Sequence, residues 1–389
     1  MVTALTATDK RLKAVVPFVG GTGFKHVDFP GGIRGSGISV HFKNIDLYRR
    51  TVDASAYWPH VTCPVMFISS SNDFHSTFER IYQSMDLLQH ANWRVSTNMH
   101  QNHGPGPEQW VLLNQWFNQH LNGIQQNIPA TPASTFSIEE STATFTVQPE
   151  DQERLLETEV YYSYDPNSRT RFWNRAKSRK DGDTWSSQLQ VHKNLPLYVF
   201  ALCRYQLDTP VSLERQETST FALNSKEHWL IPELVDLKQL SKLPKTRLLF
   251  EDFSNGTQDW SSRDQRSITT YKFQSPDLDR SNDKQLEFQV NPSGKRLSLR
   301  INASSKFLSQ ENNLGDFVFV KNIEGNQTQK ITISRKDFKN VDGKTLEWSK
   351  LSTFGITLID RDNGQKIMLT TRAGQKFIPS IRLSNPGKP

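Results

Sequence analysis

The spacing of apolar residues divides the chain into a first part that alternates between two patterns and a later part with one pattern. In the first 123 residues, continuous apolar runs of strand length alternate with stretches where apolar residues recur every three to four positions. This alternation is typical of a parallel sheet covered by helices on both faces. The predicted strands are Arg11–Val19, Pro64–Ser69 and Trp93–Met99, and the predicted helices are Ile45–Trp58, Thr77–Leu88 and Pro107–Leu121.

Beyond residue 123 the apolar period changes to two, which is typical of strands with one buried face. Residues 124–135 are rich in Gln, Asn, Pro and Thr and are predicted to be a linker. Residues 136–230 are predicted to form a small antiparallel, Ig-like β-sandwich, and residues 245–389 a jelly-roll-like β-sandwich. The expected fold class is therefore α/β followed by all-β, with residues 1–123 forming part of an α/β domain.

Composition narrows the possible partners of the chain. The 389 residues carry a net charge of +7, but Lys and Arg are scattered among 40 acidic residues, so no nucleic-acid partner is expected. No run of about 18 apolar residues occurs, and no membrane span is predicted. Cys63 and Cys203 fall in different predicted domains and lack metal-ligand spacing, so both are expected to pack as unpaired thiols. Neither a cofactor nor a metal ion is expected.

Two polar loops follow predicted parallel strands, where α/β proteins place their catalytic groups. Asp73 lies in the first loop, and His100 and His103 lie in the second, about 30 residues later. An acid after one strand and a histidine after the next match the late half of a Ser…Asp…His order. In such a triad the imidazole takes the proton of the nucleophile, and the carboxylate fixes the imidazole tautomer.

Each of these residues also has a structural interpretation. Asp73 could cap the helix that begins near Thr77, although Ser76 is the better candidate for that cap. A histidine in a loop rich in Gly and Pro is often only solvated. His103 is the favoured general base because it directly precedes the Gly104–Gly106 turn, and His100 is the alternative.

Three stretches of the first part share a family pattern: Thr8–Gly21, Cys63–Ser69 with Asn72 and Asp73, and His100–His103. On these stretches residues 1–122 resemble the end of bacterial α/β-hydrolases of the acetyl-xylan-esterase, dienelactone-hydrolase and prolyl-oligopeptidase-like group. The resemblance implies a secreted or periplasmic hydrolase of carboxylic esters, such as acetylated carbohydrates, with Asp73 and His103 as two of its catalytic residues.

The nucleophile of this group is the point where the chain departs from the pattern. No G-x-S-x-G elbow occurs, and Gly35–Ser39 is rich in glycine but does not match it. In the family pattern the serine would fall a few residues before Met1, so we expect upstream sequence to supply it and this chain alone to be inactive. The competing interpretation is a non-catalytic scaffold or carbohydrate-binding protein with a degenerate hydrolase half.

Residues 245–389 contain Leu249–Phe253 with Trp260, and later Thr328–Phe338, Leu346–Trp348 and Phe354–Ile356. On these stretches the region loosely resembles carbohydrate-binding jelly rolls attached to secreted hydrolases, which implies a possible polysaccharide partner. Sugar binding would need exposed rings, whereas Trp260 and Trp348 are more simply interpreted as core residues. Glu251 and Asp252 could contribute to a Ca²⁺ site, but two carboxylates are few for an ion that takes six to eight oxygens.

Overall fold

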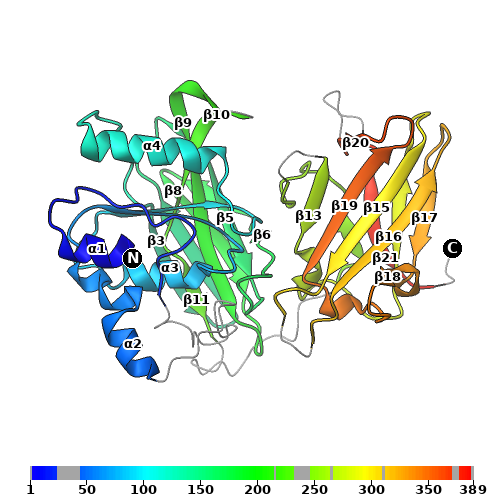
Figure 1. The fold of residues 1–389 in the computed structure, drawn as a ribbon, viewed down its shortest axis with the longest axis horizontal. Helices are drawn as coiled ribbons and strands as arrows, with labels where there is room; N and C mark the ends of the chain where they lie inside the picture. Colours follow the sequence, from blue (N-terminus) through cyan, green and yellow to red (C-terminus); the bar gives the residue numbers. More distant parts are fainter. Residues whose placement is uncertain are drawn as a thin grey trace. The chain divides into compact units, whose positions relative to one another are not determined.

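The computed structural model describes residues 2–23, 44–213, 216–231, 246–262, 266–308, 312–369 and 376–386. The chain separates into two compact units (Figure 1). The first unit comprises residues 1–169 and 173–242, and the second comprises residues 170–172 and 243–389. Both units are rich in strands and contain antiparallel sheets, as the later part of the sequence predicts.

A small parallel sheet lies in the first unit. β1 (Val65–Ser70) and β2 (Trp93–Asn98) pair in parallel, with Val65 opposite Trp93. The predicted strand at Arg11–Val19 is present only as two parallel bridges, from Val15 to Val65 and from Phe18 to Ile68. Pro17 lies between the bridged residues and has no N–H to donate, so a continuous ladder cannot form there.

Helices accompany the parallel sheet, and two of them differ from the prediction. The predicted helix Thr77–Leu88 is shorter and spans Phe78–Met85. The segment predicted as one helix from Ile45 to Trp58 breaks after Thr51, because Asp53 caps a short 3-10 turn by accepting the N–H of Ser55. The α-helices of this region are α1 (Val2–Thr8), α2 (Ile45–Thr51), α3 (Phe78–Met85) and α4 (Pro107–Leu121), and the 3-10 helices are η1 (Ala54–Ala56) and η2 (Trp58–His60).

Two antiparallel sheets follow in the same unit. One has the order β3-β4-β8-β7 and the other β10-β9-β5-β6, with β11 also paired to β9. The strands are β3 (Ala133–Glu139), β4 (Thr142–Gln148), β5 (Leu155–Ser163), β6 (Asn174–Arg175), β7 (Arg179–Asp181), β8 (Thr184–Gln190), β9 (Leu197–Leu213), β10 (Gln216–Asn224) and β11 (His228–Leu230).

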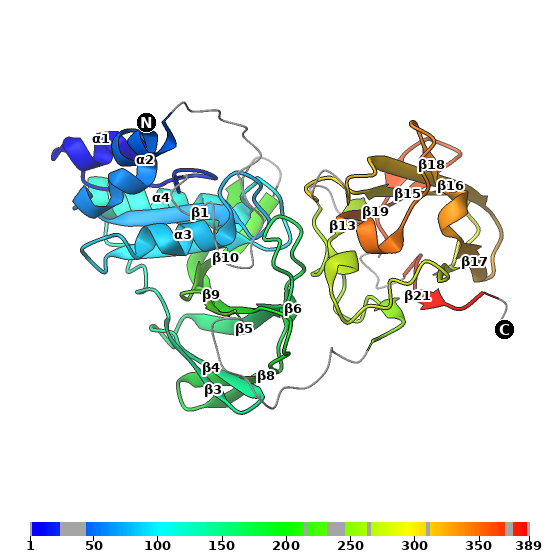
Figure 2. The same cartoon turned by 90° about the horizontal axis from the view of Figure 1, so that it is seen from below.

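The β10-β9-β5-β6 sheet packs against the parallel one, and Figure 2 shows β5 and β9 between β1 and the strands β3, β4 and β8. One core cluster includes Ile68 of β1 and Trp116 of α4 with Phe145 and Val199 of the antiparallel strands. At the outer edge of β2, Asn224 of β10 accepts a hydrogen bond from the backbone N–H of Thr97 (3.2 Å) and donates one to its hydroxyl (2.8 Å). Strand β10 thus covers the edge that a small parallel sheet would otherwise expose.

Helix α4 is joined to the antiparallel sheet by charged groups. Its Glu108 accepts hydrogen bonds from Arg204 Nε of β9 (2.8 Å) and from the hydroxyl of Thr220 of β10 (2.5 Å). Arg204 also pairs with Glu157 and Glu159, and these carboxylates raise the pKa of the guanidinium. The ion pairs compensate the desolvation of a largely buried arginine and fix the position of α4 on the sheet.

The second unit consists of two antiparallel sheets around one core. The first sheet has the order β12-β21-β14-β17 and the second β13-β19-β15-β16-β18, with β20 also paired to β19. Alternate residues of both sheets, such as Phe288 and Ile301, are fully buried in a single cluster. The elements are β12 (Leu249–Glu251), β13 (Ser267–Thr270), η4 (Lys272–Gln274), β14 (Gln285–Val290), β15 (Leu297–Ser304), β16 (Asp316–Ile323), β17 (Gln329–Ile333), η6 (Arg335–Asp337), β18 (Lys339–Asn340), η7 (Trp348–Lys350), β19 (Thr353–Asp360), β20 (Lys366–Ile367) and β21 (Ser380–Ser384).

Two expectations from composition can be compared with the structure. Within the described ranges, no helix combines the length and the apolar character that crossing a membrane requires. Both cysteines are buried and unpaired, as predicted. Burial raises the pKa of the Cys203 thiol to about 12, which is the behaviour of a thiol packed among apolar groups.

Candidate functional site

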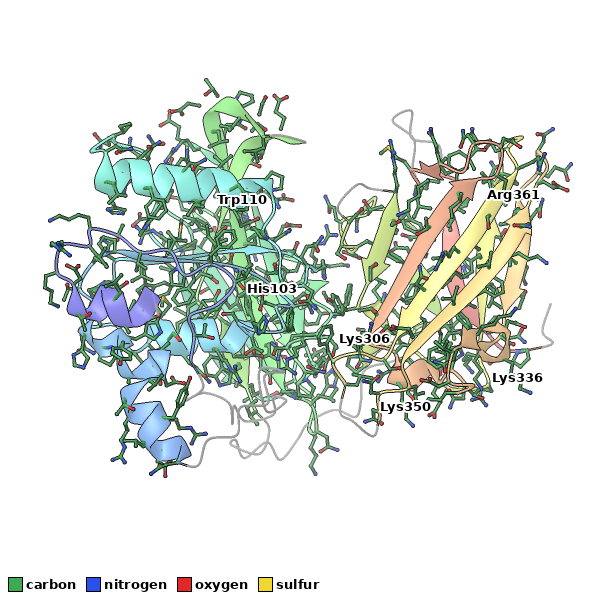
Figure 3. All side chains as sticks on the ribbon, in the orientation of Figure 1. His103, Trp110, Lys306, Lys336, Lys350 and Arg361 are labelled. Carbon is green, nitrogen blue, oxygen red and sulfur yellow. The ribbon has the colours of Figure 1, made fainter. Side chains whose placement is uncertain are left out.

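Asp73 and His103 meet at the carboxyl ends of the two parallel strands. The Nδ1 atom of His103 lies 2.9 Å from Oδ2 of Asp73, a hydrogen-bond distance. The Asp73 side chain is completely buried, whereas the His103 side chain is 36 % exposed, and Figure 3 labels this histidine. The pair therefore has a hidden acid and a ring that solutes can approach.

Hydrogen bonds hold the carboxylate of Asp73 in place. Its Oδ1 atom accepts the backbone N–H groups of His75 (2.8 Å) and Ser76 (2.6 Å). These bonds leave Oδ2 to His103 and fix the plane of the carboxylate. The prediction that Ser76 caps the next helix is wrong, because Thr77 occupies the N-cap position and its side chain makes no cap bond.

Two serine hydroxyls connect the loop of Asp73 to the loop of His103. The hydroxyl of Ser70 donates to the carbonyl of Gly104 (2.7 Å) and accepts the N–H of the same residue (3.0 Å). The hydroxyl of Ser71 accepts the N–H of His100 (2.7 Å). The sequence analysis assigned no role to these serines, because their partners lie about 30 residues away and nothing local marks the contact.

His100 and His103 take different positions in the second loop. Both have backbone φ angles in the left-handed region, 55° and 47° respectively, which costs a non-glycine residue free energy that its surroundings must compensate. The ring of His100 is buried and meets Tyr161 edge to face, with ring centroids 6.3 Å apart. The structure therefore brings His103, the favoured histidine, to Asp73, and places the alternative His100 against Tyr161.

Aromatic rings enclose one side of the His103 imidazole. The centroid of Phe74 lies 4.8 Å from that of His103, and the centroid of His75 lies 5.0 Å from it. Because a carboxylate oxygen can only accept, Nδ1 of His103 carries a hydrogen, and in the neutral imidazole Nε2 then keeps its lone pair. An imidazole in this tautomer is suited to remove a proton from a hydroxyl or a water.

No nucleophile is found beside this imidazole among the residues that the structure describes. None of the hydrogen bonds in those ranges joins Nε2 of His103 to a serine, threonine or cysteine. The glycine-rich stretch Gly35–Ser39, which fails the elbow pattern, lies outside the described residues.

The second unit contains Trp260, Trp348 and Glu251, which the sequence analysis considered as possible sugar-binding or Ca²⁺-binding residues. Trp260 is 5 % exposed and Trp348 is fully buried, so neither ring is a surface platform for sugars. The carboxylate of Glu251 accepts the Lys272 ammonium (2.5 Å) and the indole N–H of Trp260 (2.7 Å). The Lys272 ammonium thus binds the Glu251 carboxylate that was considered as a Ca²⁺ ligand. The described residues hold no group of three or more His, Cys, Asp or Glu able to bind a metal ion.

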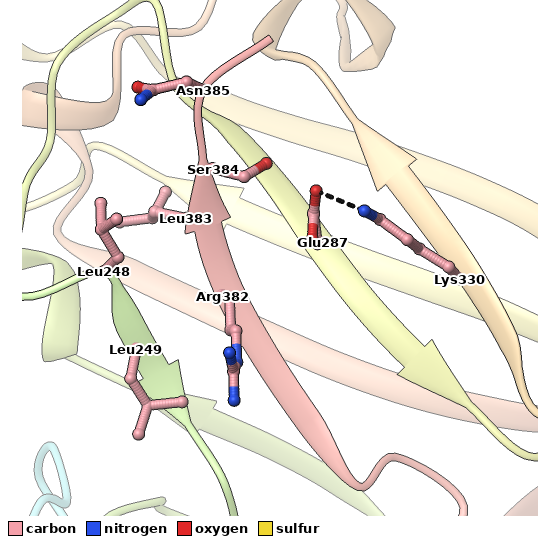
Figure 4. Close-up of a pocket in the computed structure, with 8 residues that line it drawn as sticks. All are labelled: Leu248, Leu249, Glu287, Lys330, Arg382, Leu383, Ser384 and Asn385. Carbon is pink, nitrogen blue, oxygen red and sulfur yellow. Dashed lines mark ion pairs between the residues drawn. The ribbon is translucent and has the colours of Figure 1, made fainter. Parts of the chain in front are cut away.

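A hollow of about 410 Å³ lies on the outer face of the β12-β21-β14-β17 sheet (Figure 4). Glu287 and Lys330 form an ion pair of 2.8 Å inside it, and Arg382 lies opposite Glu287 on the neighbouring strand. Leu248 and Leu249 contribute apolar surface at one end. The carboxylate that lines the hollow is thus already paired with an ammonium group.

Comparison with known proteins adds little to these observations. No protein-family model matches the chain, and no curated protein matches it. A solved structure that it resembles is titled Bacteroides ovatus mixed-linkage glucan utilization locus SGBP-B in complex with mixed-linkage heptasaccharide. The similarity has a TM-score of 0.15 at 6 % identity and covers 63 % of this chain and 49 % of that one, about half its length. A likeness this low does not show a common fold.

Proposed function

We propose that the chain carries the acid and the general base of a serine hydrolase of the α/β type, acting on carboxylic esters. The observation that supports the proposal is the 2.9 Å hydrogen bond between buried Asp73 and partly exposed His103, at the ends of adjacent parallel strands. Acetylated carbohydrates are the substrate class that the sequence resemblance implies, with a secreted or periplasmic location. The nucleophilic serine lies outside the described residues.

In this proposal the chain's own groups perform the proton transfers. Asp73 accepts the Nδ1 hydrogen, holds the ring in one tautomer, and stabilises the imidazolium that forms. His103 Nε2 removes the proton of the serine hydroxyl as its oxygen attacks the ester carbonyl, and returns the proton to the departing alkoxide. In the second half of the cycle Nε2 takes a proton from a water as its oxygen attacks the acyl group. The acyl–serine bond breaks, Nε2 returns the proton to the serine oxygen, and the carboxylic acid leaves.

The test is ester turnover by the protein of the complete natural reading frame, with the 389-residue chain measured beside it. The substrates are p-nitrophenyl acetate and an acetylated xylo-oligosaccharide. We expect His103→Ala to lower kcat/KM by at least about 10³-fold, because a triad without its base retains only binding and oxyanion stabilisation. His60→Ala is the matched control, since His60 is exposed and remote from Asp73 in the hydrogen-bond network.

Labelling by a fluorophosphonate gives a second, independent readout. The probe should modify one serine of the complete protein, and the rate should fall in His103→Ala but not in His60→Ala. Turnover that persists within a few-fold in a folded His103→Ala protein would exclude the proposed role. Absence of both turnover and labelling in the complete protein would favour the non-catalytic alternative.

A further inference from the structure

A groove of about 430 Å³ runs across the outer face of the second unit's larger sheet, over strands β13, β19, β15 and β16. Alternation along the strands places one set of side chains in the core and the other in this groove. In β19, Phe354 and Ile356 are buried in the core, so Thr353, Gly355 and Thr357 lie on the groove side. The volume lies in the range that proteins use for small ligands.

Gly355 lines the groove and has no side chain that would project into it. A Cβ atom on this residue would lie 3.1 Å from Oγ1 of Thr269, 3.4 Å from the carbonyl of Ile268 and 3.5 Å from the carbonyl of Asn302. A larger side chain on Gly355 would project from β19 into the groove. The depth of the groove at this position therefore depends on the glycine.

The polar groups of the groove are rich in hydroxyl and amide side chains. The members that carry this argument are Thr269, Asn302 and Thr353, with Ser267, which accepts a hydrogen bond from the buried Thr357 hydroxyl (3.0 Å). Such groups both donate and accept hydrogen bonds, as a ligand with many hydroxyls requires. Phe317 is the one aromatic residue among the described lining residues, and its ring is fully buried in the core. Recognition by stacking, which single-stranded nucleic acids need, is therefore not provided here.

Two cations of the groove have no carboxylate partner among the described residues. Arg300 lies opposite Thr357 on one side of β19, and Lys366 lies opposite Ile359 on the other side. Arg300 donates through Nε to Asn302 Oδ1 (3.2 Å), which leaves the ends of its guanidinium available. Asp316, the one acidic lining residue, is neutralised by Lys306 (2.8 Å) and accepts from Ser304 (2.6 Å). The groove therefore carries an uncompensated positive charge.

From this combination we infer that the groove binds a short stretch of acidic oligosaccharide. Its ring hydroxyls meet the hydroxyl and amide side chains, and its carboxylate meets Arg300 and Lys366. A guanidinium matches a carboxylate through two parallel hydrogen bonds, which makes Arg300 the main source of charge selectivity. This inference does not depend on Asp73 and His103, so the proposed hydrolase function and the proposed glycan site can be disproved separately.

The experiment is isothermal titration calorimetry of the full chain with tri-galacturonate, beside galactotriose, a sulfated disaccharide and citrate. We expect tri-galacturonate to bind at least about tenfold more tightly than galactotriose, with an affinity that falls as salt rises. Arg300→Gln should weaken tri-galacturonate binding by about tenfold or more. Lys336→Gln removes the same charge from an exposed residue outside the groove and should have no effect.

Several outcomes would overturn the inference. These are equal affinity for galactotriose, equal binding by Arg300→Gln, or no binding of tri-galacturonate at millimolar concentration. Citrate binding as tight as tri-galacturonate would show an anion site without sugar recognition and would also overturn it. Tighter binding of the sulfated disaccharide than of tri-galacturonate would support an acidic glycan as the ligand, with sulfate instead of carboxylate as its anionic group. If the inference is correct, Gly355→Val should abolish the binding of tri-galacturonate. Because Arg300 is exposed, Arg300→Gln should not affect folding, and the test therefore does not depend on the fold of the glycine variant.

Discussion

The hydroxyl of Ser70 forms two hydrogen bonds with the same residue, donating to the carbonyl of Gly104 and accepting its N–H. Gly104 directly follows His103, whose backbone is in the left-handed region. The serine at the end of β1 therefore fixes the peptide that orients the imidazole. The loop that carries the proposed base is held by the strand that precedes the proposed acid.

Replacing Ser70 by alanine should loosen the His103 loop. The change removes this partner from the part-buried N–H of Gly104, while the carbonyl keeps the Asn98 amide as donor (3.2 Å). We expect a loss of about 1 kcal/mol in the free energy of unfolding of the first unit. Hydrogen exchange at the amides after β2 should rise. Ser69→Ala is the matched control, because the Ser69 hydroxyl is buried and has no hydrogen-bond partner in the described part of the chain. Equal effects of the two variants would contradict this role of Ser70.

Asp73→Asn should reduce ester turnover of the complete protein with little change in the fold. The new amide oxygen can still accept the N–H groups of His75 and Ser76, but its NH₂ group faces Nδ1 of His103 and selects the opposite tautomer. We expect kcat to fall by a factor on the order of 10³ to 10⁴. Asp86→Asn, which breaks an exposed ion pair with Lys226, should leave turnover unchanged. Turnover close to that of the unmodified protein would exclude Asp73 as the orienting acid.

Acidification should destabilise the first unit through His228. Burial and the nearby Lys226 lower the pKa of His228 from 6.5 to about 4, although Asp86 acts in the opposite direction. The folded form thus binds fewer protons than the unfolded form between these values. The contribution of His228 to the free energy of unfolding is fully present above pH 6.5 and is lost as the pH falls toward 4. We expect this loss to be about 2 kcal/mol once the partial exposure of the ring to solvent is allowed for.

Hydrogen exchange of β9 amides in the unmodified protein and in His228→Gln measures this contribution. Glutamine can keep a hydrogen bond to the Ser134 hydroxyl, which lies 3.0 Å from Nε2 of His228, but it does not titrate. The variant should therefore lose less stability between pH 7 and pH 4.5. Parallel pH dependence of the two proteins would rule out His228 as the source.

Removing the buried ammonium of Lys272 should strongly destabilise the second unit. Lys272 and Glu251 are 6 % and 7 % exposed, and the ammonium also pairs with Asp259 at 2.9 Å. Lys272→Met leaves the Glu251 carboxylate buried without its cation, and we expect a loss of about 3–5 kcal/mol. Lys330→Met, which breaks the more exposed pair with Glu287, should cost no more than about 1 kcal/mol. Urea unfolding monitored by exchange of β15 amides distinguishes the two.

The elements with strong local signals agree with the sequence prediction, and those shaped by distant partners do not. Helix α4 spans the predicted Pro107–Leu121, because apolar periodicity, a proline in the first turn and a preceding glycine coincide. β3 begins at Ala133, inside the predicted linker, because it is a largely polar edge strand. In the candidate site, the loops of Asp73 and His103 could be predicted because each directly follows a predicted parallel strand. The roles of Ser70 and Ser71 depend on contacts that only the folded chain creates.

The hydrogen bonds between Asn224 and Thr97, and the core that the parallel strands share with the antiparallel strands, have a consequence for limited proteolysis. A protease that cuts within residues 124–132 would separate the polypeptide into pieces whose apolar faces remain packed against each other. The nicked molecule should therefore elute from a sizing column as the intact one does, and only a denaturing gel should reveal the cut.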